Sequence, residues 1–407
     1  GLSLSVSIPA KEEADATMAT ALLGLFKSLL CLRTPRIHKM ILDDASGIIR
    51  PGTLTLVIGP PRSGKTSLMH ALSGRVNAHH LSGVVTINGE PASSLHREKI
   101  IGLSEQDDDH LAHLTVRETL LFAQKCGSFY LQSTGSKPNA DDYRRFDAIK
   151  TEVFLSCMEL TGVADQPVGD ELLRGISGGE RKRVTLAETI IGNRLLYFLD
   201  EMSTGLDAVT TYKLLSNLGI WAKELGTSFV VSLLQPSPEA FELFDDVILM
   251  GEGKIVWNGP RVRVMGYFES LGYRCPNDKD PAEFLIEIPT EFGRGFLSDV
   301  QQEHSIAALV KQYKASDIFK STQAELVVPS NRAAISAPGL YEPYISKHYS
   351  REFDMPFLEN TKLVFSRQFK LAMRDKAFIR SRIVQCLFVG ILSGTLFWQI
   401  SFEKDIL

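Results

Sequence analysis

The segment GPPRSGKTS at residues 59–67 constrains the fold more than any other part of the sequence. It fits the pattern G-x-x-x-x-G-K-[ST], with Gly59, Gly64, Lys65 and Thr66 at the required positions. A short β-branched run precedes it and helical spacing follows, which predicts a strand, a loop and a helix. Glycines let backbone N–H groups curl around phosphate oxygens, and the helix start adds its positive dipole end.

We therefore expect this loop to bind the polyphosphate of a nucleotide. Lys65 is expected to reach the outer phosphates and the Thr66 hydroxyl to ligate Mg²⁺. The alternative is a merely structural Gly-rich turn, but the flanking strand and helix argue for a binding loop. The predicted nucleotide contacts are Gly59, Pro60, Pro61, Arg62, Ser63, Gly64, Lys65, Thr66 and Ser67.

An acidic pair follows a second apolar run, in YFLDE. Asp200 is expected to hold Mg²⁺, directly or through water, and Glu201 to polarise an attacking water as general base. An Asp-Glu pair after an apolar strand is by itself usually a helix cap. The presence of the phosphate loop favours the catalytic interpretation.

The segment GISGGERKRVTLAETI predicts a second helix start that can bind an anion. A chain with one phosphate loop has no evident use for it internally, so we expect it to close on a nucleotide held by another subunit or half. The basic residues 181–183 suggest nucleic acid, but a solvated helix face is the better interpretation. The residues of this helix start are Ser177, Gly178, Gly179 and Glu180.

Apolar runs place the other strands. RLLYFLDE and SFVVSLL are continuous runs that suit strands buried on both faces of a parallel sheet. DDVILMGEGKIVWNGP predicts a hairpin, and GVVTINGE one half of another. Helical patterns dominate between Gln106 and Leu195, which predicts an inserted helical subdomain. After about Thr290 the apolar periodicity weakens.

Composition excludes several classes of protein. A chain of 407 residues predicts two or more modules. The net charge of −4 gives no general attraction to nucleic acid, so we expect no nucleic-acid partner. The five cysteines form no C-x-x-C pair, which argues against zinc and redox motifs.

The C-terminal part predicts contact with a lipid bilayer. Residues 357–382 combine basic and apolar side chains at helical spacing, typical of a helix on an anionic membrane surface or of a solvated surface helix. Residues 383–402 carry no charge, and roughly 20 residues of helix cross a bilayer. Arg380 and Arg382 favour a cytosolic start for this span. A buried core helix is the alternative.

The motifs together resemble those of ABC-type ATPases. GPPRSGKTS, ISGGE, YFLDE and STGLDA match the Walker A, signature, Walker B and D-loop elements in that order. LTVRETLLFA, RGISGGERKRVTLAE and DEMSTGLDAVTTYKL resemble more closely the first nucleotide-binding half of full-size ABCG transporters of the pleiotropic drug resistance type. The resemblance covers about residues 40–300 and 357–407.

This resemblance implies an α/β fold: a P-loop ABC ATPase core with a parallel sheet, an antiparallel β-subdomain and an inserted helical subdomain. The expected organisation is an N-terminal extension (1–39), a nucleotide-binding domain (40–290, helical subdomain about 107–194), a linker (291–356), an amphipathic connecting helix (357–382) and a first transmembrane helix (383–402). We expect the chain to be a fragment whose membrane domain continues beyond Leu407.

The resemblance also implies function. It predicts an ATP-hydrolysing half of a multi-pass exporter, in the plasma membrane, with a cytosolic nucleotide-binding domain and a lipophilic cargo. Two ATP molecules would lie between this half and a second one, so Ser177 would act in trans. Gln106 would ligate Mg²⁺ in the Q-loop, and Asp207 belongs to the D-loop.

Two positions depart from the family pattern. Leu234 stands where a switch histidine normally contacts the terminal phosphate, so turnover at this site is expected to be slow. No aromatic residue is placed to stack on adenine, and His38 is better interpreted as a surface residue. The alternatives are a soluble ABC-type ATPase acting on ribosomes or DNA, and a regulatory half that binds ATP with little hydrolysis.

Overall fold

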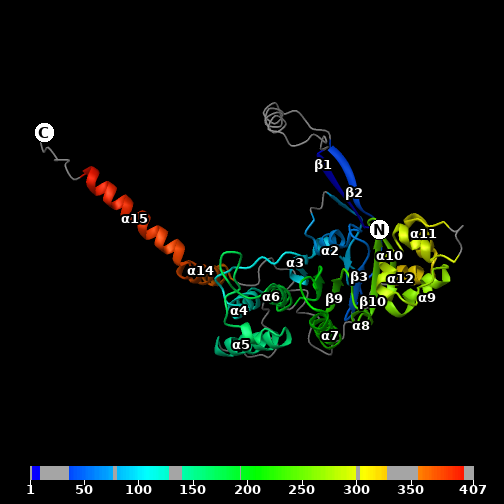
Figure 1. The fold of residues 1–407 in the computed structure, drawn as a ribbon, viewed down its shortest axis with the longest axis horizontal. Helices are drawn as coiled ribbons and strands as arrows, with labels where there is room; N and C mark the ends of the chain where they lie inside the picture. Colours follow the sequence, from blue (N-terminus) through cyan, green and yellow to red (C-terminus); the bar gives the residue numbers. More distant parts are fainter. Residues whose placement is uncertain are drawn as a thin grey trace.

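The computed structural model describes residues 2–9, 36–76, 80–127, 140–192, 194–298, 303–327 and 356–397. Its centre is a six-stranded sheet in the order β11-β10-β3-β9-β8-β7. Figure 1 labels the neighbouring strands β10, β3 and β9 of this sheet. All strands run parallel except β11, which pairs with β10 antiparallel. The strands are β3 Leu54–Ile58, β7 Ile101–Ser104, β8 Leu196–Leu199, β9 Ser228–Ser232, β10 Asp246–Gly251 and β11 Lys254–Pro260.

The continuous apolar runs form the buried strands of this sheet, as predicted. Every residue of β3 and β9 is buried, because α7 packs against both strands and α10 packs against β3. The hairpin predicted around residues 251–253 is confirmed as the β10–β11 turn. Further helices are α2 Lys65–Ser73, α3 Arg97–Ile100, α7 Ala208–Leu225, α8 Pro238–Glu242, α9 Arg261–Ser270 and α10 Pro281–Glu287, with 3₁₀ turns η2 Ala92–Ser94, η3 Thr161–Val163 and η4 Glu291–Phe296.

A second, antiparallel sheet contains part of the expected N-terminal extension. Its order is β2-β1-β4, with β1 Leu2–Pro9, β2 Arg36–Ala45 and β4 Leu81–Ser82. Leu2 and Leu4 are buried because LSLSVSIP alternates apolar and polar residues, which gives the strand one apolar face. The boundary expected at residue 39 therefore differs from the structure, where β1 belongs to this β-subdomain.

The small hairpin β5 Thr86–Ile87 and β6 Glu90–Pro91 completes the β-subdomain. Its turn residues Asn88 and Gly89 have φ angles of 52° and 84°, so both adopt the left-handed conformation that two-residue hairpin turns require. The Asn-Gly turn predicted from the sequence is confirmed.

The helical subdomain consists of α4 Val116–Gly127, α5 Ala140–Cys157 and α6 Gly178–Ile190. Buried polar groups join α4 to α5: the Gln124 amide donates to Asp147 Oδ1 at 2.8 Å, and the Thr151 hydroxyl donates to Gln124 Oε1 at 3.0 Å. Each helix lies within the predicted range 107–194.

The expected linker contains two packed helices, α11 Ile306–Ala315 and α12 Asp317–Val327, which contact β11. Ile306, Leu309, Val310 and Tyr313 follow helical spacing, and they place an apolar face on the core. The Tyr313 hydroxyl donates to the Asn258 carbonyl oxygen at 2.9 Å. The body that contains the central sheet thus extends at least to residue 327, beyond the predicted boundary at 290.

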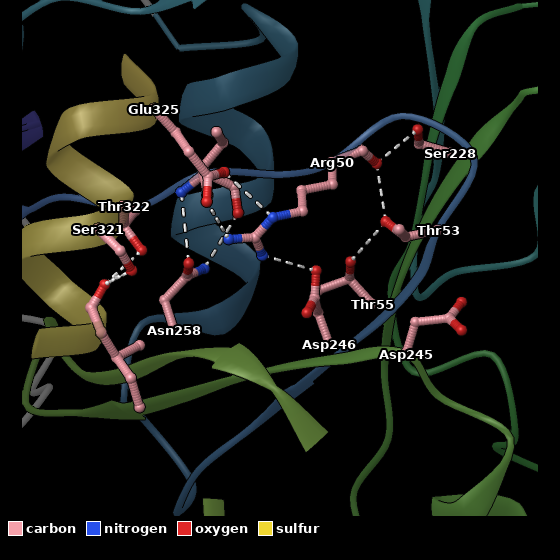
Figure 2. A network of polar contacts seen from close by, with 12 residues as sticks. Arg50, Thr53, Thr55, Ser228, Asp245, Asp246, Asn258, Ser321, Thr322 and Glu325 are labelled. Atoms are coloured by element: carbon pink, nitrogen blue, oxygen red, sulfur yellow. Dashed lines mark hydrogen bonds and ion pairs between the residues drawn. The ribbon is translucent and has the colours of Figure 1, made fainter. Parts of the chain in front are cut away.

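The Arg50 side chain connects α12 to the central six-stranded sheet, as Figure 2 shows. Its Nε and Nη2 atoms donate to the two carboxylate oxygens of Glu325 at 3.2 and 3.1 Å, while Nη1 contacts Asp246 Oδ2 at 3.1 Å. The Arg50 carbonyl oxygen accepts hydrogen bonds from Thr53 and Ser228. One residue therefore links α12, the start of β10 and the loop before β3.

The C-terminal helices are α14 Phe357–Arg374 and α15 Lys376–Phe397, which extend away from the body beside the helical subdomain (Figure 1). The helix breaks at Asp375 and not near residue 382 as expected, because the Asp375 carboxylate caps α15 by accepting from the Phe378 amide at 2.9 Å. By length and composition α15 qualifies as a candidate membrane span, and none of its residues is buried in the protein. Residues 398–402 of the predicted span lie outside the described residues.

Candidate functional site

The residues predicted to bind the nucleotide and the metal, and the predicted general base, follow neighbouring strands at one edge of the central sheet. Strands β3, β9, β8 and β7 are parallel neighbours, so their carboxyl ends lie together. The residues that follow these strands are, in the same order, the 59–67 loop, Leu233 and Leu234, the Asp200–Glu201 pair, and Glu105 and Gln106.

The 59–67 loop has the backbone shape of a phosphate cradle. Gly59 and Gly64 have φ angles of 153° and 97°. A Cβ on Gly59 would lie 2.4 Å from the Met250 carbonyl oxygen, so only glycine fits. Gly64 precedes α2 without a side-chain cap, which leaves the N-terminal amides of that helix available to an anion.

Lys65 is buried at the centre of this loop. Its Nζ donates to the carbonyl oxygens of Gly59 and Pro60 at 2.8 and 3.0 Å. Burial lowers the pKa of Lys65 below its usual value, and the nearby carboxylates of Glu201 and Asp200 oppose this shift. The ammonium therefore contacts the cradle and is close enough to the acidic pair to interact with its charges.

Asp200 has one carboxylate oxygen available to bind a cation. Its side chain is 1% exposed. Oδ1 accepts a hydrogen bond from the Ser232 hydroxyl at 2.5 Å, whereas Oδ2 is buried and has no hydrogen-bond partner within the described ranges. A buried carboxylate oxygen left unpaired suits a metal ion. With the exposed Thr66 hydroxyl, it matches Mg²⁺, which takes one or two protein ligands together with phosphate oxygens.

Glu201 follows Asp200 in a left-handed conformation, with a φ of 46°. Its amide donates to the Ser232 hydroxyl at 2.7 Å, and its Oε2 accepts from Gln106 Nε2 at 2.7 Å. The structure thus brings Gln106 and Glu201 into direct contact. Sequence reasoning missed Ser232, which orients both acidic residues, although its place at the end of an apolar run was a usable signal.

The predicted anion-binding start of α6 is a capped helix. The Ser177 hydroxyl accepts from the Glu180 amide at 3.3 Å, and Glu180 Oε2 accepts from the Ser177 amide at 2.8 Å. Within the described parts of the chain, no hydrogen bond or ion pair joins residues 177–180 to the 59–67 loop. Ser177 and Gly178 are exposed, so a second molecule can reach them.

The D-loop and switch positions lie close to these motifs. Asp207 caps α7 by accepting from the Thr210 amide at 2.9 Å. The Gly205 carbonyl oxygen lies beside Gly179, where a Cβ would be 3.0 Å away, so the D-loop and the signature are neighbours. Leu234 is 47% exposed and offers no polar atom. The side chain of His38 lies outside the described residues.

The basic residues 181–183 do not form a solvated face, because Lys182 is buried. It is 1% exposed, and its Nζ donates to the carbonyl oxygens of Glu105 and Gln106 at 3.2 and 2.9 Å. Arg183 is also largely covered, since its side chain is 15% exposed, and it contacts the more exposed Glu159 at 3.4 Å.

The helix α14 docks on the helical subdomain through its basic side chains. Arg374 pairs with both carboxylate oxygens of Glu118, at 2.5 and 2.9 Å, and Lys370 approaches the same carboxylate at 3.2 Å. Arg367 lies 4.0 Å from the centre of the Phe122 ring. The site is therefore connected to α14 through α4, which follows the segment containing Gln106.

Family models match two parts of the chain. A model described as ABC transporter matches residues 42–204, which include the 59–67 loop, Gln106 and the start of α6. A model described as ABC-2 type transporter matches residues 234–307, which form β10, β11 and the helices packed beside them. The apolar helix α15 lies outside both matches.

The chain is also similar to named plant proteins. It is 33% identical to ABC transporter G family member 31 of Arabidopsis thaliana, over 97% of this chain and 29% of that protein. It is 35% identical to ABC transporter G family members 36 and 38 of Oryza sativa subsp. japonica, over 90% and 96% of this chain. It spans less than a third of the length of these relatives. The converging motifs and these matches show that the chain contains an ABC nucleotide-binding domain and belongs to the ABC transporter G family.

Proposed function

We propose that this chain is the ATP-hydrolysing half of a full-size exporter of the pleiotropic drug resistance type. It would couple ATP binding and hydrolysis to the movement of a lipophilic or amphipathic compound across a membrane. The observation that carries the proposal is the convergence of the Lys65 ammonium, the unpaired Asp200 oxygen and the Glu201 carboxylate at one sheet edge.

The residues have distinct roles in this proposal. Lys65 would exchange its contacts with the Gly59 and Pro60 carbonyl oxygens for phosphate oxygens of ATP. Asp200, Thr66 and Gln106 would hold Mg²⁺, which supplies positive charge against the phosphate oxygens. Glu201 would accept the proton of the attacking water, once Gln106 no longer occupies its Oε2.

Two partners complete the proposed machine. A second nucleotide-binding half would present its own signature to the 59–67 loop, while Ser177 of this chain acts at the other half's nucleotide. Support comes from the exposure of Ser177, since within the described residues no hydrogen bond or ion pair joins it to the loop of its own chain. The other partner is a membrane domain, which α14 and α15 would join to this body.

The proposed location is the plasma membrane, with the nucleotide-binding domain in the cytosol. The uncharged run from Ile383 to Phe397 in α15 supports insertion in a bilayer, because no residue of this helix is buried in the protein. Arg380 and Arg382 near its start support the cytosolic side.

Glu201→Gln in the full-length protein tests the proposal. We expect ATP turnover to fall by about 100-fold or more with ATP affinity unchanged, because the substitution removes the base and leaves the cradle intact. Glu224→Gln, on the exposed surface of α7, is the matched control. Unchanged turnover in the Glu201 variant would show that this site is not hydrolytic.

A regulatory half that binds ATP with little hydrolysis is the second candidate, and Leu234 favours it. Leucine donates no hydrogen bond to a terminal phosphate, so this site lacks one contact to the transferred group. Turnover that depends only on the other half's glutamate would establish the regulatory role. The soluble-ATPase alternative is disfavoured by α15, a candidate membrane span in which no residue is buried. Extraction of the protein into buffer without detergent would support that alternative.

A further inference from the structure

Lys182 is a buried cation that the proposed chemistry does not use. It lies on α6, the helix that begins at the signature, and its side chain points to the segment that follows β7. The three donors of its ammonium face three acceptors: the carbonyl oxygens of Glu105 and Gln106 at 3.2 and 2.9 Å, and Asp108 Oδ1 at 3.5 Å.

The same face of α6 makes further contacts with this segment. The Thr185 hydroxyl, one turn after Lys182, lies 2.6 Å from Asp108 Oδ1 and 2.8 Å from His110 Nε2. His110 Nδ1 lies 3.3 Å from Glu188 on the next turn. These contacts fix the distal end of the segment, whereas Lys182 alone among them holds the backbone of Gln106.

Burying an ammonium is unfavourable unless its donors are fully satisfied. An apolar side chain would fill the same space on α6 without this desolvation cost. The groups that Lys182 satisfies are main-chain carbonyl oxygens of Glu105 and Gln106. The side chain of Gln106, in turn, donates to Glu201 at 2.7 Å. Gln106 therefore links the Lys182 ammonium to Glu201, the proposed general base.

We propose that Lys182 is a positioning residue that sets Gln106 at the nucleotide site from the signature helix. It makes the Q-loop, which serves this chain's own nucleotide, and the signature, which would serve the partner half's nucleotide, move together. The inference rests on the proposed function, because it assigns Lys182 a role in that same hydrolysis.

Lys182→Met in the full-length protein tests this role. Methionine replaces the apolar stem of lysine and lacks the ammonium, so the cradle is unchanged while the Gln106 carbonyl oxygen loses its donor. We expect kcat for ATP to fall by about 10- to 100-fold, as for other residues that orient a ligand of a metal site, with KM within about twofold. Arg183→Met, on the same helix and bound to the surface residue Glu159, should leave both constants unchanged.

A double-mutant cycle separates positioning from general damage. If Lys182 acts through Gln106, then Lys182→Met should lower kcat no further in a Gln106→Ala background. Lys182→Arg keeps the charge and donors, and it should retain at least about a third of the wild-type kcat. An equal loss in both backgrounds, or an equal rise in KM, overturns the inference.

Failure of the inference about Lys182 can be distinguished from failure of the proposed function. If the wild-type protein hydrolyses ATP and Lys182→Met does so equally well, the inference fails and the proposed function stands. If Glu201→Gln leaves turnover unchanged, the proposed function fails first. Should Lys182→Met not fold, Asp108→Asn weakens one acceptor of the ammonium, and its smaller loss in kcat should again vanish with Gln106→Ala.

Discussion

Arg62 adopts a backbone conformation that favours glycine, with a φ of 64° in the phosphate cradle. Its side chain is exposed, and no hydrogen bond or ion pair from the described residues holds it. A left-handed conformation costs a residue with a Cβ roughly 1 kcal/mol or more. The loop thus carries a strained, unpaired cation beside the place where phosphates would bind.

Arg62→Gly should therefore change stability and affinity in opposite directions. We expect the free energy of unfolding to rise by about 1 kcal/mol, because glycine relieves the strain. We expect ATP to bind about two- to fivefold more weakly, because an exposed charge near the phosphates is lost. Chemical denaturation and a nucleotide titration measure the two effects.

Arg62→Ala is the control, since it removes the charge and keeps the Cβ. It should weaken ATP binding equally without the gain in stability. Equal affinity in the wild-type protein and both variants would contradict a contact between the guanidinium and the nucleotide.

The sequence predicted residues whose role depends on their type and local spacing. Lys65, Asp200 and Glu201 follow apolar runs, and parallel strands bring such positions to one edge. Lys182 could not be predicted in this way, because its partner Gln106 is 76 residues away along the chain. Ser232 does end an apolar run, but its partner Asp200 is 32 residues away, so its role could not be assigned from local spacing. A basic residue between two arginines is indistinguishable from a surface residue until the packing of α6 is known.

Helix α14 uses one face for the body and leaves another exposed. Arg367, Lys370 and Arg374 contact α4, whereas Phe365, Phe369 and Met373 are at least 58% exposed. The basic residues expected to face lipid thus partly face protein. The exposed apolar stripe suits the membrane surface.

The contact at Glu118 should depend on pH. Burial acts to raise the pKa of Glu118, but hydrogen bonds from Arg374, the Thr115 amide and Lys370 lower it to about 2 from 4.5. Because the folded pKa lies below the unfolded value, the stabilisation is complete above about pH 4.5 and disappears as the pH falls towards 2.

Glu118→Gln should loosen this contact at neutral pH. We expect the amides of α14 to exchange with deuterium about tenfold faster, because two cations lose their charged acceptor. Glu359→Gln, exposed in the first turn of α14, is the control. Unchanged exchange in the Glu118 variant would show that other contacts hold α14.

At the scale of elements, the sequence predicted strands better than boundaries. The sheet strands are short apolar runs whose pattern is local. The limits at residues 39, 290 and 382 were displaced because pairing of β1, packing of α11 on β11 and capping by Asp375 decided them. Two of these three effects are contacts between distant segments of the chain, and the hydrophobic periodicity of the sequence does not reveal such contacts.

At the scale of the whole molecule, helices α11 and α12 complete the body that contains the central sheet. Tyr313 and Arg50 attach α11 and α12 to β10 and β11, so we expect residues 303–327 to unfold together with the sheet. Tyr313→Phe should lower the free energy of unfolding by about 1 kcal/mol, because the Asn258 carbonyl oxygen loses a buried donor.

Urea denaturation in detergent measures this loss. Tyr212→Phe, partly exposed on α7, is the control and should change the midpoint little. A separate early transition in the Tyr313 variant would mean that α11 and α12 form an independent unit.

The interruption at Asp375 gives the molecule a natural cutting point. A chain that ends at Arg374 would keep both hydrogen bonds from Arg374 to Glu118 and would lack the candidate membrane span α15. Such a protein would allow crystallography and calorimetry of the folded body with α14 still docked, in aqueous buffer without detergent.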